Sequence, residues 1–350
     1  MQAQAVRIAA QGTPEVMKLE SVDVAAPGAN EAQIRQTAIG VNFMDVYHRG
    51  GQYPLPLPSG IGIEAAGVIE AVGSAVTGLK KGDRVVYAGS APGSYASLRN
   101  MPAERLIKIP EGVSEETAAA ILTKGMTAEY LLNRCYTVKP GEFVLFMAAA
   151  GGVGLVAGQW GKHLGARMIG VAGGAAKCQL AKDNGYEFVI DRHKEDIAAR
   201  VKEITGGAGV PVVYDSVGKA TFDVSIKSLA PRGFFISFGT TTGAPPAVEA
   251  ATLQKMGSLY FTRPTLANYC VAREDLVMSS TRVFDMLKKG VIKAHIGQRY
   301  KLADVVRAHA DLEAGKTVGR RCWFRNYLIK TNSYIVLWSG ARSGSDNLRA

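Results

Sequence analysis

The sequence has no long hydrophobic run. No stretch reaches the roughly 18 consecutive apolar residues that a membrane-spanning helix requires. The N-terminus, Met1-Gln2-Ala3-Gln4, also lacks the charged and then apolar pattern of a secretory signal. These two absences predict a cytoplasmic protein that has no membrane partner.

Cysteine is scarce, and its spacing excludes two classes of small stabilised domain. No C-x-x-C pair occurs, and the four cysteines are widely separated: Cys135, Cys178, Cys270 and Cys322. This pattern matches neither a disulfide framework nor a structural zinc site. We expect reduced, mostly buried thiols.

The composition is that of a soluble globular enzyme. The chain has 350 residues, of which 47% are hydrophobic and 20% charged, and this length predicts two domains rather than one core. No motif recurs at a fixed period, which excludes a solenoid. The net charge of +11 is compatible with a phosphate-rich ligand and does not require nucleic acid, so we expect no nucleic-acid partner.

Two kinds of pattern divide the chain. Short β-type runs separated by turn signals fill residues 1–125 and predict a mostly β domain. From Ser114 the pattern becomes helical, and a second helix is expected over 127–134. Strands and helices then alternate over 144–239, which predicts a parallel, doubly wound Rossmann sheet. The fold class is therefore α/β.

The expected domains follow from these patterns. We expect a β-rich domain at 1–125, completed by about 265–319, and a Rossmann domain at 126–264. Helices are expected at 281–290 and 302–314, returning the chain to the first domain.

A glycine-rich turn, Ala148 to Gly154, lies between an apolar run and a predicted helix. Unpaired N–H groups at a helix start attract a pyrophosphate, and glycines let the backbone approach it. The turn departs from the usual G-x-G-x-x-G motif because Ala149 stands where the first glycine would be. Taken alone, the turn also fits glycines that serve only tight packing.

The end of the second Rossmann strand favours NADPH over NADH. An Asp or Glu at this point binds the free 2′-hydroxyl of NAD, but here Met168–Ala172 is followed by Gly173-Gly174-Ala175-Ala176-Lys177. Lys177 can neutralise a 2′-phosphate, with Arg192 after the third strand as a second partner. The alternative for both residues is a solvated surface cation.

Six segments in order carry a family resemblance. The chain resembles the zinc-independent quinone oxidoreductases of the medium-chain dehydrogenase/reductase superfamily, with the ζ-crystallin branch as close kin, over residues 4–319. The resemblance implies a GroES-like catalytic domain beside the Rossmann domain, with NADPH as the cofactor. The segments are 38–45, 63–69, 82–85, 148–154, 214–218 and 237–239.

The zinc ligands of metal-dependent relatives are replaced in this chain. Their positions correspond to Asn42, Ile63 and Lys124, none of which is a good zinc ligand. Without a Lewis acid an alcohol is hard to oxidise, whereas a quinone or conjugated enone accepts a hydride readily. We therefore predict a metal-free NADPH:quinone reductase.

The resemblance also implies site residues. Asn42, Tyr47 and Tyr53 are expected to line an acceptor cleft between the domains and to hydrogen-bond a quinone oxygen, and Lys124 is a candidate proton donor. The alternatives are loop stabilisation for Asn42, ordinary packing for the two tyrosines and ion pairing for Lys124. The implied cofactor contacts are Asn42, Tyr47, Tyr130, Gly151, Gly152, Val153, Gly173, Lys177, Arg192, Ser216, Phe238, Gly239 and Arg263.

The C-terminal end departs from the family. Members finish with a short apolar strand, whereas this chain continues from Arg320 to Ala350 as an atypical tail without clear periodicity. If the final strand of the first domain were lost, stability would suffer. An exposed tail rich in aromatics would also favour aggregation, so we expect part of it to pack on a surface.

Two other functions remain open, and so does the oligomeric state. An NADPH-dependent reductase of enals or enones would share nearly all these residues. A non-catalytic NADPH- or RNA-binding protein would match the ζ-crystallin kinship, although no aromatic-basic RNA motif is present. Kin are commonly dimers through an edge of the Rossmann sheet, and residues 258–261 are the expected edge strand of a homodimer.

Overall fold

The computed structural model describes residues 1–315 and 334–338. The chain divides into two compact units, one formed by 1–123 and the residues from 294 onward, the other by 124–293. The unit boundaries differ from the expected domain limits, because residues 265–293 cluster with the second unit. Helix α9 (Arg273–Lys288) accordingly belongs to unit 2, and α10 (Val305–Glu313) to unit 1.

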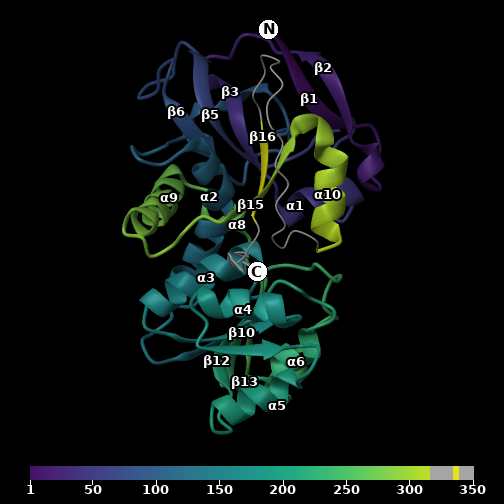
Figure 1. Cartoon of the computed structure of the whole chain (residues 1–350), viewed down its shortest axis with the longest axis vertical. Coiled ribbons are helices and arrows are strands. Elements are labelled where there is room, and N and C mark those ends of the chain that lie inside the picture. The colour runs from purple at the N-terminus through teal and green to yellow at the C-terminus, as the bar shows by residue number, and fades with distance from the viewer. Residues whose placement is uncertain (316–333, 339–350) are drawn as a thin grey trace, which may run out of the picture. The chain divides into compact units, whose positions relative to one another are not determined.

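Unit 1 is built on β-sheets. A three-stranded sheet has the order β2-β1-β4, and a larger sheet has the order β15-β16-β3-β5-β6-β8, with β7 also paired to β3 (Figure 1). The strands are β1 (Gln2–Ile8), β2 (Lys18–Asp23), β3 (Glu31–Gly40), β4 (Ser59–Gly60), β5 (Glu64–Val72), β6 (Arg84–Tyr87), β7 (Leu98–Pro102), β8 (Ile107–Lys108), β15 (Ile296–Lys301) and β16 (Tyr334–Trp338). Helix α1 (Phe43–Gly50) follows β3 directly.

Alternating apolar side chains of these strands form the unit 1 core. Ile34 and Ile39 of β3 and Val85 of β6 are fully buried, and Val305 and Ala308 of α10 pack into the same cluster. The helix near the chain's end therefore covers the core that the N-terminal strands begin.

The strand β16 supplies what the family's usual C-terminal strand would supply. Its backbone pairs in parallel with β3, Tyr334 opposite Ala38, and antiparallel with β15. The last strand of unit 1 is therefore present, although it comes from the tail. The remainder of the predicted tail, 320–333 and 339–350, lies outside the described residues.

Unit 2 contains the predicted Rossmann sheet, and the fold-class prediction is confirmed. Its six parallel strands have the order β11-β10-β9-β12-β13-β14, with helices between successive strands (Figure 1). The strands are β9 (Phe143–Phe146), β10 (Arg167–Ala172), β11 (Phe188–Asp191), β12 (Val210–Asp215), β13 (Leu229–Ser237) and β14 (Tyr260–Thr262). The helices are α3 (Gly152–His163), α4 (Ala175–Asp183), α5 (Ile197–Ile204), α6 (Phe222–Lys227), α7 (Ala250–Lys255), α8 (Leu266–Tyr269) and α9.

One predicted break in the chain is wrong. A separate second helix was expected over 127–134, but α2 runs without interruption from Glu115 to Tyr130 and is followed by a π-helical turn, Leu131–Cys135. Gly125 serves close packing instead, since a Cβ there would lie 2.6 Å from Cγ1 of Val283 on α9. The cost of a glycine inside a helix is offset here by helix–helix contact.

No helix in the described part of the chain is both long and apolar enough to cross a membrane.

Candidate active site

The carboxyl edge of the unit 2 sheet gathers most of the predicted cofactor residues. Because its strands are parallel, the segments that follow them all leave at one edge. In strand order these residues are Arg192 after β11, Gly173 and Lys177 after β10, Gly151, Gly152 and Val153 after β9, Ser216 after β12, Phe238 and Gly239 after β13, and Arg263 after β14. We call this set the sheet-edge site.

The glycine turn after β9 has the geometry of a phosphate cradle. Ala148 opens it with a φ of 54°, in the left-handed region that glycine favours. Helix α3 begins at Gly152 without a side-chain cap, which leaves backbone N–H groups for an anion. A Cβ at Gly154 would lie 2.5 Å from the Ala148 carbonyl oxygen. Close packing and phosphate access are therefore served by different glycines of the same turn.

Lys124 lies against the start of this helix. Lys124 is 5% exposed, and a Cβ at Gly152 would lie 3.3 Å from the Lys124 Cδ. The helix dipole makes this end of α3 positive, and a buried ammonium beside it adds a second positive charge. An anion bound at the turn would be attracted by both, so the residues present fit a pyrophosphate.

The ends of β10 and β11 carry three basic side chains. Lys177 is half-buried on α4, and a Cβ at Gly173 would lie 2.8 Å from Arg192 Nε and 2.9 Å from His193 Nε2. His193 was not predicted from the sequence, where its one signal is its place beside Arg192. The donors present fit a 2′-phosphate better than a free hydroxyl.

The segments that follow β12, β13 and β14 lie at the same edge of the sheet. A Cβ at Gly239 would lie 2.6 Å from the Ser216 carbonyl oxygen, so the segments after β12 and β13 approach each other closely. The rings of Phe238 and Phe146 are 5.5 Å apart, and Arg263 Nη1 donates a hydrogen bond of 2.9 Å to the Ser237 carbonyl. Each predicted residue here has a structural contact as well, and glycine is required at 239 by backbone proximity.

Tyr130 ends α2 as a buried aromatic. Its ring stacks on that of Tyr269 at 4.5 Å, and burial raises the pKa of the Tyr130 hydroxyl. The group therefore stays protonated and can act only as a neutral hydrogen-bonding partner.

In unit 1, Asn42 is held by a buried carboxylate. It lies directly before α1, its side chain is largely buried, and its Nδ2 donates a hydrogen bond of 2.9 Å to Glu64 Oε2. The other oxygen of Glu64 accepts one of 2.6 Å from the Thr123 backbone N–H. Glu64 thus fixes the orientation of the Asn42 amide. The resemblance had marked Glu64 only as part of a motif.

Tyr47 and Tyr53 form one aromatic group. Tyr47 is buried on α1, and its ring meets that of Tyr53 edge-to-face at 5.4 Å. The backbone supports this arrangement, because the Tyr53 N–H donates to the Tyr47 carbonyl at 3.2 Å. The structure therefore places Tyr47 and Tyr53 in contact, while Asn42 caps the start of the helix that carries Tyr47. We call Asn42, Tyr47 and Tyr53 the acceptor group.

A buried hydrogen-bond chain, missed by sequence reasoning, secures the acceptor group. The Asn42 N–H donates to Asp45 Oδ2 at 2.8 Å, and the Tyr95 hydroxyl donates to the same oxygen at 2.9 Å. His309 Nε2 lies 2.9 Å from that hydroxyl. Because the single hydroxyl proton goes to Asp45, Nε2 must carry the proton that it shares with Tyr95. Only the Asn42–Asp45 spacing, typical of a capped helix start, is visible in the sequence.

Burial decides the charge state of the histidine in this chain. Loss of solvent, with a smaller effect of the nearby Arg49 guanidinium, lowers the pKa of His309 to about 3. The imidazole is therefore neutral at physiological pH. Arg49 itself donates to both carboxylate oxygens of Glu313, at 2.9 and 2.6 Å, which ties α1 to α10 a second time.

The residues at the metal positions of zinc-dependent relatives have other roles in the structure. Asn42 donates to a carboxylate, Ile63 is a buried apolar residue of unit 1, and Lys124 covers the start of α3. Within residues 1–315 and 334–338, no three His, Cys, Asp or Glu residues are grouped so that they could hold a metal ion.

Comparison with known families agrees with the division into two kinds of unit. The family described as alcohol dehydrogenase GroES-like domain matches residues 28–111, and the family described as zinc-binding dehydrogenase matches residues 152–280. The first match falls within unit 1 and the second within unit 2. The predicted pairing of a GroES-like domain with a Rossmann domain is confirmed.

Individual proteins give a closer match. A quinone oxidoreductase of Pseudomonas aeruginosa is 46% identical over 318 residues, which cover 91% of this chain and 98% of that protein. The crystal structure of the Escherichia coli quinone oxidoreductase complexed with NADPH matches with a TM-score of 0.88 and 44% identity, covering 96% of this chain and 99% of the other. A 2-haloacrylate reductase of a Burkholderia species is 40% identical over 317 residues, 88% of this chain and 95% of that protein.

Proposed function

Because the chain belongs to the quinone oxidoreductase family, we propose that it reduces quinones with NADPH and without a metal ion. The cofactor choice is supported by the ends of β10 and β11, where Lys177, Arg192 and His193 lie and where Gly173 leaves room for Arg192 and His193. When bound, NADPH supplies the hydride. The protein's own residues bind the two reactants, orient them and exclude water.

The chain's residues divide these tasks. The N–H groups at the start of α3 and the ammonium of Lys124 would hold the pyrophosphate, and Lys177 would hold the 2′-phosphate. On the acceptor side, Asn42 and the hydroxyls of Tyr47 and Tyr53 would hydrogen-bond a quinone oxygen and stabilise the negative charge that develops on it. Lys124 remains the proposed proton donor.

The direct test is a steady-state assay of protein whose folding has been verified by circular dichroism. We expect NADPH oxidation that depends on added 1,4-benzoquinone and that persists after dialysis against a chelator. No quinone-dependent oxidation by folded protein would refute the proposal. Loss of the activity on chelation, with recovery on adding zinc, would refute its metal-free part.

The cofactor preference has its own test in Lys177→Ala. Removing one hydrogen bond to a charged group should weaken NADPH binding by about 1–3 kcal/mol and leave NADH binding nearly unchanged. Fluorescence titration of each dinucleotide measures both. Lys182→Ala, on the same helix, is the matched control and should change neither affinity. Equal losses for both dinucleotides would remove Lys177 from the 2′-phosphate site.

A second candidate activity is the reduction of activated alkenes, favoured by the 40% identity to the 2-haloacrylate reductase. An acrylate presents a carbonyl oxygen to the acceptor group much as a quinone does, so the same donors serve both. Comparing kcat/KM for 1,4-benzoquinone and 2-chloroacrylate decides between them. A clear excess with the acrylate would make alkene reduction the principal activity.

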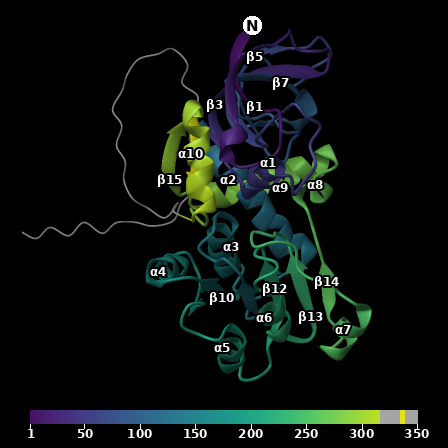
Figure 2. The same ribbon diagram turned by 90° about the vertical axis from the view of Figure 1, so that its right-hand side faces the viewer.

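We further propose a homodimer through the open edge of the unit 2 sheet. Figure 2 shows β12, β13 and β14 side by side, with β14 outermost, and only β13 pairs with β14 among the described strands. Tyr260 on this strand is 54% exposed and stacks on Phe234 at 4.4 Å. An unpaired, aromatic edge is suited to pairing with a second copy. Sedimentation equilibrium should give a dimer, and Phe261→Pro should shift it toward monomer.

A further inference from the structure

The turn after β11 places two basic side chains over one glycine. Pairing of β10 with β11 continues past the strand ends, since the Arg192 N–H donates to the Ala172 carbonyl at 2.9 Å. Arg192 Nε and His193 Nε2 then lie 2.8 and 2.9 Å from where a Cβ of Gly173 would stand. Any other residue at 173 would displace both side chains. The glycine therefore makes room for two nitrogen-bearing groups at the adenine-ribose end of the sheet-edge site.

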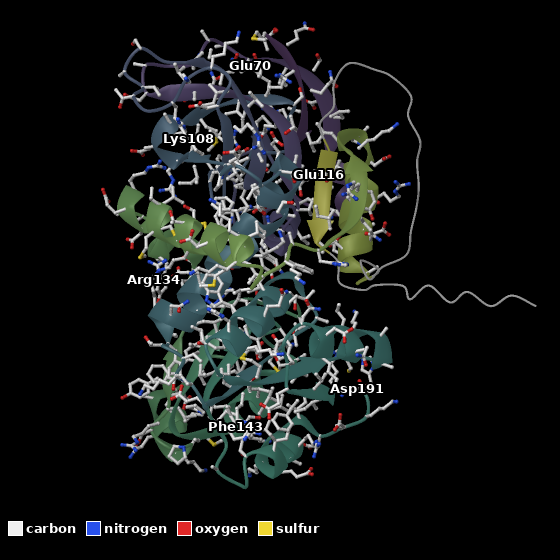
Figure 3. The ribbon with its side chains drawn as sticks, turned by 60° about the vertical axis from the view of Figure 1, so that its left-hand side comes forward. Glu70, Lys108, Glu116, Arg134, Phe143 and Asp191 are labelled. Carbon is white, nitrogen blue, oxygen red and sulfur yellow. The ribbon has the colours of Figure 1, made fainter. Side chains whose placement is uncertain are left out.

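A buried carboxylate holds this turn without competing for a ligand. Asp191, labelled in Figure 3, accepts hydrogen bonds from the backbone N–H groups of Gly174, at 2.9 Å, and His193, at 3.1 Å. Those two bonds, the one from Gly174 first, lower the pKa of the Asp191 carboxyl. Its charge is thus directed at the backbone, and it fixes His193 beside the start of α4.

The basic groups at this point are available to bind an anion. Arg192 and His193 are exposed and Lys177 is half-buried, and within the described residues none of the three makes an ion pair. Helix α4 begins here behind Gly174 without a side-chain cap, which adds its positive end. A phosphate monoester has both the charge and the number of acceptor oxygens to use all these donors.

We propose that His193 is the titrating ligand of the 2′-phosphate, so that preference for NADPH over NADH weakens as the pH rises and the imidazole loses its proton. This inference rests on the proposed NADPH function. Histidine is the side-chain type that ordinarily changes charge between about pH 5 and 8, whereas lysine and arginine ordinarily stay positive over that range. Binding of the phosphate favours the imidazolium, so a proton is taken up with the ligand.

Other charged groups lie around His193. Asp191 interacts electrostatically with His193, and Arg192 lies on the same turn. Cys178, on α4, has its thiol pKa raised by burial and stays neutral. The charged and titratable residues of its own turn and of the first turn of α4 are Asp191, Arg192, Lys194, Glu195, Lys177 and Cys178.

The test compares 2′,5′-ADP with 5′-AMP by isothermal titration calorimetry from pH 6 to 8.5. The two probes differ only in the 2′-phosphate and need no catalysis. Titration in buffers of different ionisation enthalpy counts the protons taken up. The phosphate has its own ionisation near pH 6, and His193→Gln reports that contribution alone.

In the wild type we expect the affinity ratio of 2′,5′-ADP to 5′-AMP to fall by about tenfold from pH 6.5 to 8.5, the scale of one charge-assisted hydrogen bond. His193→Gln should abolish this fall and reduce the proton uptake near neutral pH. His193→Arg should keep the high ratio at pH 8.5, because its charge is permanent. Arg192→Gln should lower the ratio at every pH yet keep its pH dependence, and His163→Gln, exposed on α3, should match the wild type.

Two results would overturn the proposal, and they are distinguishable. If the wild type prefers 2′,5′-ADP but His193→Gln keeps the same pH profile and proton uptake, His193 does not bind the phosphate and the NADPH function stands. If the wild type shows no preference for 2′,5′-ADP at any pH, the 2′-phosphate site and the NADPH assignment fail together.

Discussion

At the scale of single residues, Glu64 fixes the orientation of Asn42, one member of the acceptor group. The Asn42 amide donates a hydrogen bond of 2.9 Å to the Glu64 carboxylate, and both residues are buried. A zinc-dependent relative would use this place for a ligand to the metal. Here the carboxylate orients a hydrogen-bond donor instead, and in the proposed function that donor would meet a quinone oxygen.

Asn42→Asp tests this pair. The substitution replaces a donor with a second acceptor beside a buried carboxylate, so we expect unfolding free energy at pH 8 to fall by about 3–5 kcal/mol. The loss should shrink as the pH falls toward 5, because a proton shared by the two carboxyl groups restores the hydrogen bond. Urea unfolding at both pH values measures this. Asn42→Ala is the control, and a loss equally independent of pH in both variants would contradict the expectation.

The position of the sheet-edge site residues could be predicted from the sequence for a physical reason. Gly152, Gly173 and Lys177 follow strands whose apolar runs are continuous and whose parallel order fixes the edge at which each residue lies. Tyr95 and His309 could not be identified from the sequence. Tyr95 lies 50 residues from Asp45 along the chain, and His309 lies 214 residues from Tyr95. Such contacts are made by the tertiary fold alone.

At the scale of elements, the hydrogen-bond chain from α10 to α1 makes stability depend on pH. The pKa of His309 is about 3 in the folded protein against an ordinary value of 6.5, so the unfolded chain binds a proton that the folded chain excludes between these values. Stability is therefore unaffected above about pH 6.5 and falls as the pH falls below it, by about 1.4 kcal/mol per pH unit.

His309→Gln tests this dependence, because glutamine can still donate to the Tyr95 hydroxyl but does not titrate. From pH 7 to 5 the wild type should lose about 2 kcal/mol more unfolding free energy than the variant does. Urea unfolding monitored by circular dichroism gives the comparison. His163→Gln, exposed on α3, should retain the full loss. If His309→Gln lost as much stability as the wild type between these pH values, the buried neutral imidazole would not be the cause.

Helix α2 shows why some element boundaries escape sequence reasoning. The sequence predicted a separate second helix over 127–134, and a glycine in a helix interior is costly. In the structure, Val283 of α9 fills the space that a side chain at 125 would need. The sequence records the glycine but not the helix that packs on it.

At the scale of the whole molecule, the first unit is closed by the end of the chain. Strand β16 lies between β3 and β15, so its backbone hydrogen bonds join the first and last parts of the sequence. Unit 1 can therefore be completed only after all of unit 2 has been made, because residues 124–293 are inserted within it. Contacts so distant in sequence slow folding, since the loop must close before they form.

Val336→Pro tests whether this strand supports the acceptor group. Val336 pairs with Gly40 of β3 and Arg299 of β15, and proline there removes a backbone donor from the middle of the sheet. We expect a loss of about 3 kcal/mol or more beyond that of Val336→Ala, which keeps the N–H. Hydrogen exchange should quicken for β3 amides near Gly40 in the proline variant only, with unit 2 amides unchanged. Equal exchange in both variants would mean that β3 and the Asn42 turn after it are stable without β16.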